Sequence, residues 1–284
     1  MKRLILALVF GLLSQAFLIQ ISLIEGWAQA ATQPAPANAP AAAAAKTPAP
    51  TAAAPRYSRE ATITESAGKV LITANSPRPL SQVLDALLQK YKWLVGYEDP
   101  QFTAQEDLVT ATGVDSRQLP NGGAFSVELP AISPGAAPDE EKTLRAVVDA
   151  YNQSKNPGRY ELRKSAQGIF YVVGTAAHDD KGAITPQKPI LDSPVTVGEA
   201  QRSVGETLNL MCQDLSSRAH TTVVIGVSPR SPLENNVAKL GAKDVPARDF
   251  MLQALAKLPK PTYWRLLFDP TSKEYYLDLH YVHF

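Results

Sequence analysis

The side chains that could do acid–base or metal chemistry are few, and the four histidines come first. His280 and His283 are three residues apart in a stretch typical of a β-strand, where alternation sends them to opposite faces. A metal ion needs its ligands on one side, so we expect solvated or edge histidines here. His178 precedes Asp179 and Asp180, which could bind a divalent ion, but the triplet lies in an expected polar, exposed loop.

The single cysteine, Cys212, would need an accessible thiolate and a nearby base to act as a nucleophile. It occupies an apolar helix position, where a free cysteine behaves as a small buried hydrophobe. His220 lies beyond the expected end of that helix. The chain has no Gly-x-Ser-x-Gly, no phosphate-binding glycine-rich loop and no Cys-x-x-Cys. We therefore expect no catalytic residues, no metal and no cofactor, and we predict that the protein is not an enzyme.

Aromatic residues gather near the end of the chain, where YWRLLF and EYYLDLHYV predict a hairpin. Alternation along the first strand separates one face, with Trp264, Leu266 and Phe268, from the other, with Tyr263, Arg265 and Leu267. One face must cover the helices, and packing is the simpler role for these residues. The alternative is a ligand platform for a glycan or a peptide, formed by Tyr263, Trp264 and Arg265.

The helices that would position these residues repeat one pattern. Residues 79–91, 203–215 and 246–258 each carry apolar residues at i, i+3, i+4, i+7 and i+8, which is one face of a helix. A weaker copy lies at 139–153, with acidic residues at its start, where they favour the helix dipole. On the first helix we expect Leu88→Asp to unfold the surrounding structure, and Asp85→Asn on the polar face to be nearly silent.

The segments around these helices are strand-like and follow the same order twice: strand, helix, strand, then strand, helix, hairpin. This order predicts an α+β protein with two related small units, 65–178 and 190–284, joined by a linker at 179–189. Each unit should have two helices packed on a mixed or antiparallel sheet. Residues 100–123 resemble a loop insertion in the first unit.

The pattern Pro-Leu-x-x-x-Leu-x-x-Leu-Leu, between a short strand and an apolar strand, is similar to the short N-terminal (STN) domain of secretins and TonB-dependent receptors. Residues 69–99 carry the best match and 236–268 the next. The resemblance implies a compact fold that docks to partner proteins or builds rings, with no catalytic residues. The chain departs from these families because no secretin or receptor barrel segment follows.

The N-terminal part has the composition of an export signal and a spacer. Residues 1–30 have a basic start, an apolar run at 4–24 and small residues at 28–30, so they predict a signal peptide or, if uncut, a membrane anchor. We favour cleavage after Ala30. Residues 31–64 predict a disordered Ala/Pro-rich linker, because 31–55 hold 13 alanines and 6 prolines and little that could be buried.

The net charge of the chain and its expected location limit the classes of function that we expect. Without Lys2, Arg3 and Glu25 the chain has 26 basic and 26 acidic residues, which gives no support for nucleic-acid binding. We expect membrane contact only through an uncut 4–24, and a periplasmic or exported location. The predicted function is a non-enzymatic protein-interaction or assembly module that binds an envelope protein or itself, through sheet edges. The alternative is a cell-wall or glycan-binding module that uses the C-terminal aromatics.

Overall fold

The computed structural model describes residues 57–58, 60–66, 68–111, 116–131 and 138–282. These belong to one compact unit, Ala52–Phe284. The expected signal or anchor segment 1–30 and His283 lie outside the described residues, as does most of the expected linker 31–64. The first strand begins at Thr62, before the expected end of that linker.

The fold is α+β, with five α-helices among the described residues. None of these helices is both long and apolar enough to cross a membrane. They are α1 (Pro79–Tyr91), α2 (Glu140–Asn152), α3 (Val204–Ala219), α4 (Arg230–Asn235) and α5 (Ala247–Leu255).

Local sequence explains where the long helices begin and end. Pro79 is at the first position of α1, where its missing N–H costs nothing. The side chains of Asp139 and Ser203 accept hydrogen bonds from Lys142 N and Glu206 N at the starts of α2 and α3. His220 ends α3 in the left-handed conformation, with a φ of 52°.

The strands form one large sheet and three small ones. The large sheet has the order β11-β14-β13-β3-β8-β7, and β9 also pairs with β8. Its strands are β3 (Gly96–Glu98), β7 (Arg159–Lys164), β8 (Phe170–His178), β9 (Ile184–Pro186), β11 (Val223–Ile225), β13 (Thr262–Asp269) and β14 (Glu274–Tyr281).

The small sheets are β1-β2-β6, β10-β12 and β4-β5. Their strands are β1 (Thr62–Ser66), β2 (Lys69–Asn75), β4 (Leu108–Thr110), β5 (Gln118–Pro120), β6 (Ala124–Pro130), β10 (Pro194–Ser203) and β12 (Val237–Pro246). The expected insertion at 100–123 holds β4, β5 and a short 3₁₀-helix, η1 (Gln105–Asp107). A second 3₁₀-helix, η2 (Ile190–Asp192), precedes β10.

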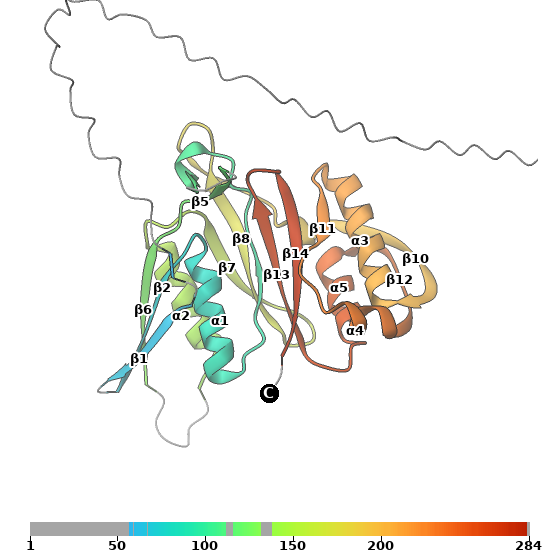
Figure 1. The fold of residues 1–284 in the computed structure, drawn as a ribbon, viewed down its shortest axis with the longest axis horizontal. Coiled ribbons are helices and arrows are strands. Elements are labelled where there is room, and N and C mark those ends of the chain that lie inside the picture. The colour runs from blue at the N-terminus through green and yellow to red at the C-terminus, as the bar shows by residue number, and fades with distance from the viewer. Residues whose placement is uncertain (1–56, 59, 67, 112–115, 132–137, 283–284) are drawn as a thin grey trace, which may run out of the picture. The chain divides into compact units, whose positions relative to one another are not determined.

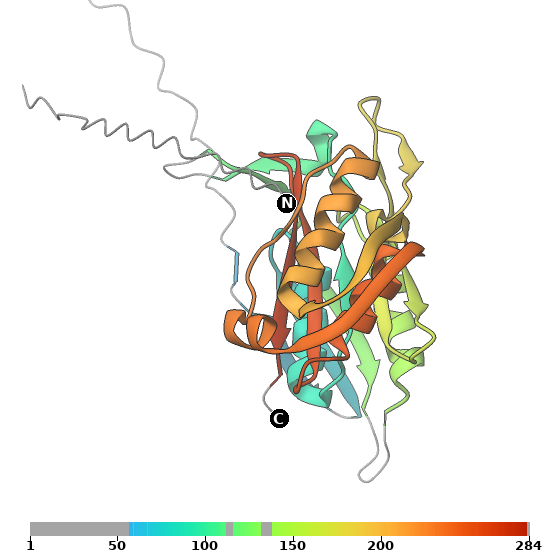
Figure 2. The same cartoon turned by 90° about the vertical axis from the view of Figure 1, so that its right-hand side faces the viewer.

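The elements stack in layers around the large sheet. Helices α1 and α2 cover one of its faces and α3 to α5 the other, with β1-β2-β6 and β10-β12 outermost (Figure 1). In the turned view, β10-β12 and α3 lie in front of β13 and β14 (Figure 2). Strand β8 shows the alternation: Phe170 and Val172 pack into the core under α1 and α2, and Tyr171 packs into the core under α3 and α5.

The two ranges expected as related units contain corresponding pairings. In the first, β2 pairs with β6 antiparallel, β3 with β8 parallel, and β7 with β8 antiparallel. In the second, β10 pairs with β12 antiparallel, β11 with β14 parallel, and β13 with β14 antiparallel. The sequence did not predict that strands of both ranges would join in one sheet, through the parallel pair β3·β13.

A buried ion network supports this β3·β13 junction. Arg248 on α5 is 2% exposed, and its Nη2 donates to Glu98 Oε2 and to Asp192 Oδ1, both at 2.8 Å. Its guanidinium carbon lies 4.6 Å from the centre of the Tyr171 ring. Burial raises the pKa of Glu98 above its ordinary value, against the pull of Arg248. Helix α5 is thereby held against the strands of the first range.

Candidate functional site

The strongest candidate site is the open edge of β11, the last strand of the large sheet. Tyr275 N donates to Thr222 O and Gly226 N donates to Leu277 O, so residues 222, 224 and 226 direct their backbone groups at β14. Backbone groups alternate in direction along a strand. The N–H and C=O of Val223 and Ile225 therefore point away from β14, toward the open edge of the sheet.

Side chains satisfy part of this edge. Ser216 Oγ accepts from Val223 N at 2.8 Å. Just past the strand, Asp278 Oδ1 accepts from Val227 N at 2.7 Å, while Val227 O accepts from Leu279 N of β14. Between them, the Ile225 backbone has no hydrogen-bond partner among the described residues. Val224 and Val227 are 36% and 64% exposed, so apolar side chains flank this free position. Such an edge can accept another strand.

A cavity of about 430 Å³ adjoins the edge on the side of β13 and β14. It reaches Gly226 and Val227, just past the end of β11, and combines apolar with charged residues, among them Arg78, Arg117, Leu267, Asp269, Tyr276 and Asp278. Asp269 Oδ2 accepts from Arg117 Nη2 at 2.5 Å, and the Arg117 side chain is 58% exposed at the rim. The cavity therefore offers an apolar wall together with groups of both charges.

Arg78 is held by a buried carboxylate. Asp99 is 1% exposed, and its Oδ2 accepts from Arg78 Nε at 2.6 Å and from Phe268 N at 3.0 Å. Its Oδ1 accepts from Tyr97 Oη at 2.7 Å. Arg78 Nη2 donates to Phe268 O, which leaves Nη1 without a partner in the described part of the chain. This fixed guanidinium can therefore bind a carboxylate or carbonyl oxygen of a ligand.

A second cavity, of about 340 Å³, adjoins the edge on the side of α3 and α4. It shares Gly226 with the first cavity and is lined by Ile225, Glu206, Asn209, Arg230 and Leu233, among others. A strand added to β11 would therefore have a hollow on each of its faces. Because side chains alternate between the faces of a strand, both hollows could take side chains of one extended segment.

The three residues of the predicted ligand platform, Tyr263, Trp264 and Arg265, do not lie together on one surface. Trp264 is 1% exposed in the core under α3 and α5, so it cannot bind a ligand. Arg265 is also buried, with Nη1 donating to Val95 O and Nη2 to Asp85 Oδ1. Tyr263 borders a cavity of about 570 Å³ that also has Glu60, Gln82, Asp85 and Gln89 in its lining. Its ring stacks on His280, with centroids 4.9 Å apart.

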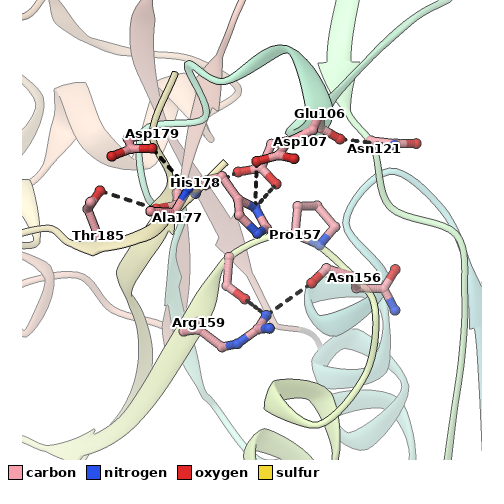
Figure 3. Close-up of polar contacts among 12 residues, drawn as sticks. Glu106, Asp107, Asn121, Asn156, Pro157, Arg159, Ala177, His178, Asp179 and Thr185 are labelled. Atoms are coloured by element: carbon pink, nitrogen blue, oxygen red, sulfur yellow. Dashed lines mark hydrogen bonds and ion pairs between the residues drawn. The ribbon is translucent and has the colours of Figure 1, made fainter. Parts of the chain in front are cut away.

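A carboxylate–histidine pair lies where β8 ends, with Asp107 on η1 facing His178 (Figure 3). His178 Nδ1 is 2.7 Å from Asp107 Oδ1, and His178 N donates to Asp107 Oδ2 at 3.0 Å. Asp107 is 2% exposed on η1. The neighbour Asp179 instead accepts from Lys181 N and Ala183 N within its own turn. The sequence did not reveal this pair, because its members are 71 residues apart.

The Asp107–His178 pair could fix the tautomer of the imidazole, as carboxylates do in acid–base sites. Within the described residues, however, no serine, threonine or cysteine side chain bonds to this imidazole. The pair joins η1 to the end of β8. Cys212 lies in the core, where burial raises its pKa to about 12.

Neither metal donors nor relatives extend this description. The described part of the chain has no group of three or more His, Cys, Asp or Glu that could bind a metal ion. No protein-family model, no curated protein and no solved structure matches the chain. The resemblance of residues 69–99 to the STN domain thus stays a prediction.

Proposed function

We propose that this chain is a non-enzymatic protein-interaction module that binds an extended segment of a protein partner along β11. The observation that supports the proposal is the unpaired Ile225 backbone between two cavities. In strand addition, main-chain hydrogen bonds supply affinity and side-chain pockets supply specificity. The edge of β11 has both, because Ile225 offers one donor and one acceptor and each face of an added strand meets a hollow.

The charges of the first cavity indicate the chemistry of the segment. Arg78 Nη1 and the exposed Arg117 favour an acidic or carbonyl-bearing side chain beside an apolar one, which would pack on Leu267. Asp278 on the same wall favours a basic group next to it. We therefore expect a partner segment of mixed charge with apolar residues between the charged ones.

A capture label and a substitution that opposes strand addition together test this proposal. Val227→Cys carries a photo-reactive thiol label that captures the bound partner in cells that express the chain, and the captured partner is then identified. Val224→Lys should lower capture about tenfold, since losing 1.4 kcal/mol of binding has that effect and an edge lysine opposes strand addition.

Val237→Lys is the matched control, because Val237 on β12 is also exposed, at 57%. Capture that survives Val224→Lys unchanged would count against β11 as the docking edge. Equal losses in both variants would also count against it, since the effect would then be general.

A glycan-binding module is the second candidate, favoured by the 570 Å³ cavity beside Tyr263. An aromatic ring with carboxylates and amides around it suits a sugar. The Tyr263 ring already contacts His280 and lies 4.8 Å from the Arg265 guanidinium, so less of it remains for a ligand. Binding to peptidoglycan that Tyr263→Ala abolishes, with the fold intact, would favour this candidate over docking. Trp264→Ala is unsuitable, because it would open the core.

The location is part of the proposal. The basic start, apolar run and small residues at 28–30 support export to the periplasm, with 4–24 as a tether if the segment is uncut. The intact mass of the protein from cells checks this. A chain that begins at Ala31 indicates cleavage, and a full-length chain in the membrane fraction indicates a tether. A full-length chain in the cytosol would contradict export.

We also infer that 65–178 and 190–284 are two copies of one unit, in line with the resemblance to the STN domain. The corresponding pairings of β2, β3, β6, β7 and β8 with those of β10, β11, β12, β13 and β14 support this inference. The junction β3·β13 would then be a contact between two copies of the unit inside one chain.

A further inference from the structure

The two outermost strands of the large sheet, β11 and β7, correspond in position to the two strands that pair at its internal junction, β3 and β13. The rows Tyr97–Val172–Leu162 and Ile225–Leu277–Leu266 run across β3-β8-β7 and β11-β14-β13. In these rows β3 corresponds to β11, and β7 to β13. The internal junction joins β3 to β13, while β11 and β7 are left at the ends.

From this correspondence we propose that the partner at β11 is β7 of a second copy of this chain, paired in parallel as β13 pairs with β3. This inference rests on the proposed function and names its partner. Because the contact joins two different edges, copies add head to tail, and a row of copies forms.

The internal junction fixes the expected register. There Arg265 pairs with Tyr97, Leu266 pairs with Glu98, and Asp99 N donates to Leu266 O at 2.9 Å. The corresponding contact places Glu161 of the second copy opposite Ile225 and Leu162 opposite Gly226. Val227 N then donates to Leu162 O and releases the Asp278 carboxylate.

The β7 edge has the complementary opening. The Asn152 amide bonds to Tyr160 N and Tyr160 O, at 2.9 and 2.8 Å, so these groups face away from β8. Alternation puts the N–H and C=O of Leu162 on the same outer edge, where no described residue bonds to them. Each edge thus has a side-chain cap followed by a free position two residues on, Tyr160 and Leu162 on β7 and Val223 and Ile225 on β11, and the β11 edge has a further cap at Val227 N.

The charged residues near the two edges also support a second copy of the chain as the partner. Helices α5 and α2 match at their buried positions, with Ala247 corresponding to Leu144, so Arg248 corresponds to Arg145. Arg248 packs on Tyr171 across the internal junction. Arg145, which is largely exposed, would pack in the same way on Tyr276 of the next copy.

At this contact between copies, Arg145 would also meet Asp278, because Tyr276 and Asp278 on β14 both line the first cavity. On the other side of the strand, Glu161 would face Arg230 in the second cavity. Both contacts join opposite charges.

Cross-linking between two variants tests the proposal in the chain from residue 31. One carries Glu161→Cys and the other Ile225→Cys, and a short bis-maleimide joins accessible thiols. Buried Cys212 does not react, since its pKa is raised to about 12. We expect a cross-linked dimer only when the variants are mixed, and a ladder of multimers from a chain that carries both cysteines. Arg145→Glu should lower the yield about tenfold, which corresponds to 1.4 kcal/mol, and Lys155→Glu should not.

A mixed yield no higher than that of Glu128→Cys with Ile225→Cys would overturn the proposal, as would dimers within either single variant. If the label at residue 227 still captures another protein, strand docking at β11 stands and only the second copy is excluded as the partner. If Val224→Lys also fails to reduce that capture, the proposed function fails as well.

Discussion

At the scale of single residues, Arg248 is the clearest determinant of stability, because it neutralises Glu98 where no water reaches. Arg248→Met removes the charge but keeps the length of the side chain. The variant should lose about 3–5 kcal/mol of unfolding free energy, since Glu98 is left buried and unpaired. Urea denaturation monitored by circular dichroism measures this loss.

Arg163→Met is the matched control for that experiment. Arg163 also pairs with Asp192, at 2.7 Å, but its side chain is 33% exposed. A partly exposed pair contributes about 0–1 kcal/mol. Similar losses in the two variants would contradict the role that the buried junction gives to Arg248.

His280 predicts the direction in which the stability of the fold changes with pH. Burial lowers its pKa below the ordinary value, so the unfolded chain binds the proton more readily than the folded protein does. The stability that His280 contributes is present above the unfolded pKa and is lost as the pH falls through the folded pKa. His280→Phe should therefore lose less stability than the wild type between pH 7.5 and 5. Parallel pH profiles in urea denaturation would refute this assignment.

At the scale of elements, α1 shows what apolar spacing does and does not predict. Leu88 is buried as expected, and Leu88→Asp should prevent folding. The expectation that Asp85→Asn is silent was wrong in its physical basis, because Asp85 is the counter-ion of buried Arg265. Because Arg265 is buried but Asp85 is half-exposed, Asp85→Asn should instead cost about 1 kcal/mol. Thermal denaturation of both variants checks this, and an unchanged midpoint in Asp85→Asn would contradict it.

Helices and long strands could be read from the sequence because their signals are local. The spacing at 79–91 and the acidic start of α2 lie within single turns of helix. The three-residue strands β3 and β11 carry no signal for a partner, since any short apolar run can pair with several strands. The alternation along β13 was predicted, but not that both of its faces would be covered. Trp264, Leu266 and Phe268 lie in the core under α3 and α5, and the other face meets α1, where Arg265 bonds to Asp85.

At the scale of the whole molecule, the junction predicts that residues 65–178 and 190–284 unfold together. Trp93 packs in the core under α1 and α2, and Trp264 in the core under α3 and α5. The chain from residue 31 has only these two tryptophans. Trp93→Phe and Trp264→Phe therefore report one core each by fluorescence. We expect each variant to show one urea midpoint, the same by fluorescence and by circular dichroism. Separated transitions would indicate two independent units.

The parts that the sequence could not predict are those that join distant segments. Arg248 and Glu98 are 150 residues apart, and Asp107 and His178 are 71 apart. Each of these residues is unremarkable among its own neighbours, and only the fold brings the pairs together. The open edge of β11 was anticipated only as a general property of sheets, because its position depends on which strands had already paired.

The amide of Ile225 gives the most direct test of docking at β11. Its hydrogen exchange is measured in the dilute chain and again with the partner captured through the label at residue 227, a complex that keeps Ile225. We predict fast exchange in the free protein and strong protection in the complex, with the amides of β10 and β12 unchanged. A complex in which the Ile225 amide exchanges as fast as in the free protein would contradict strand addition at this edge.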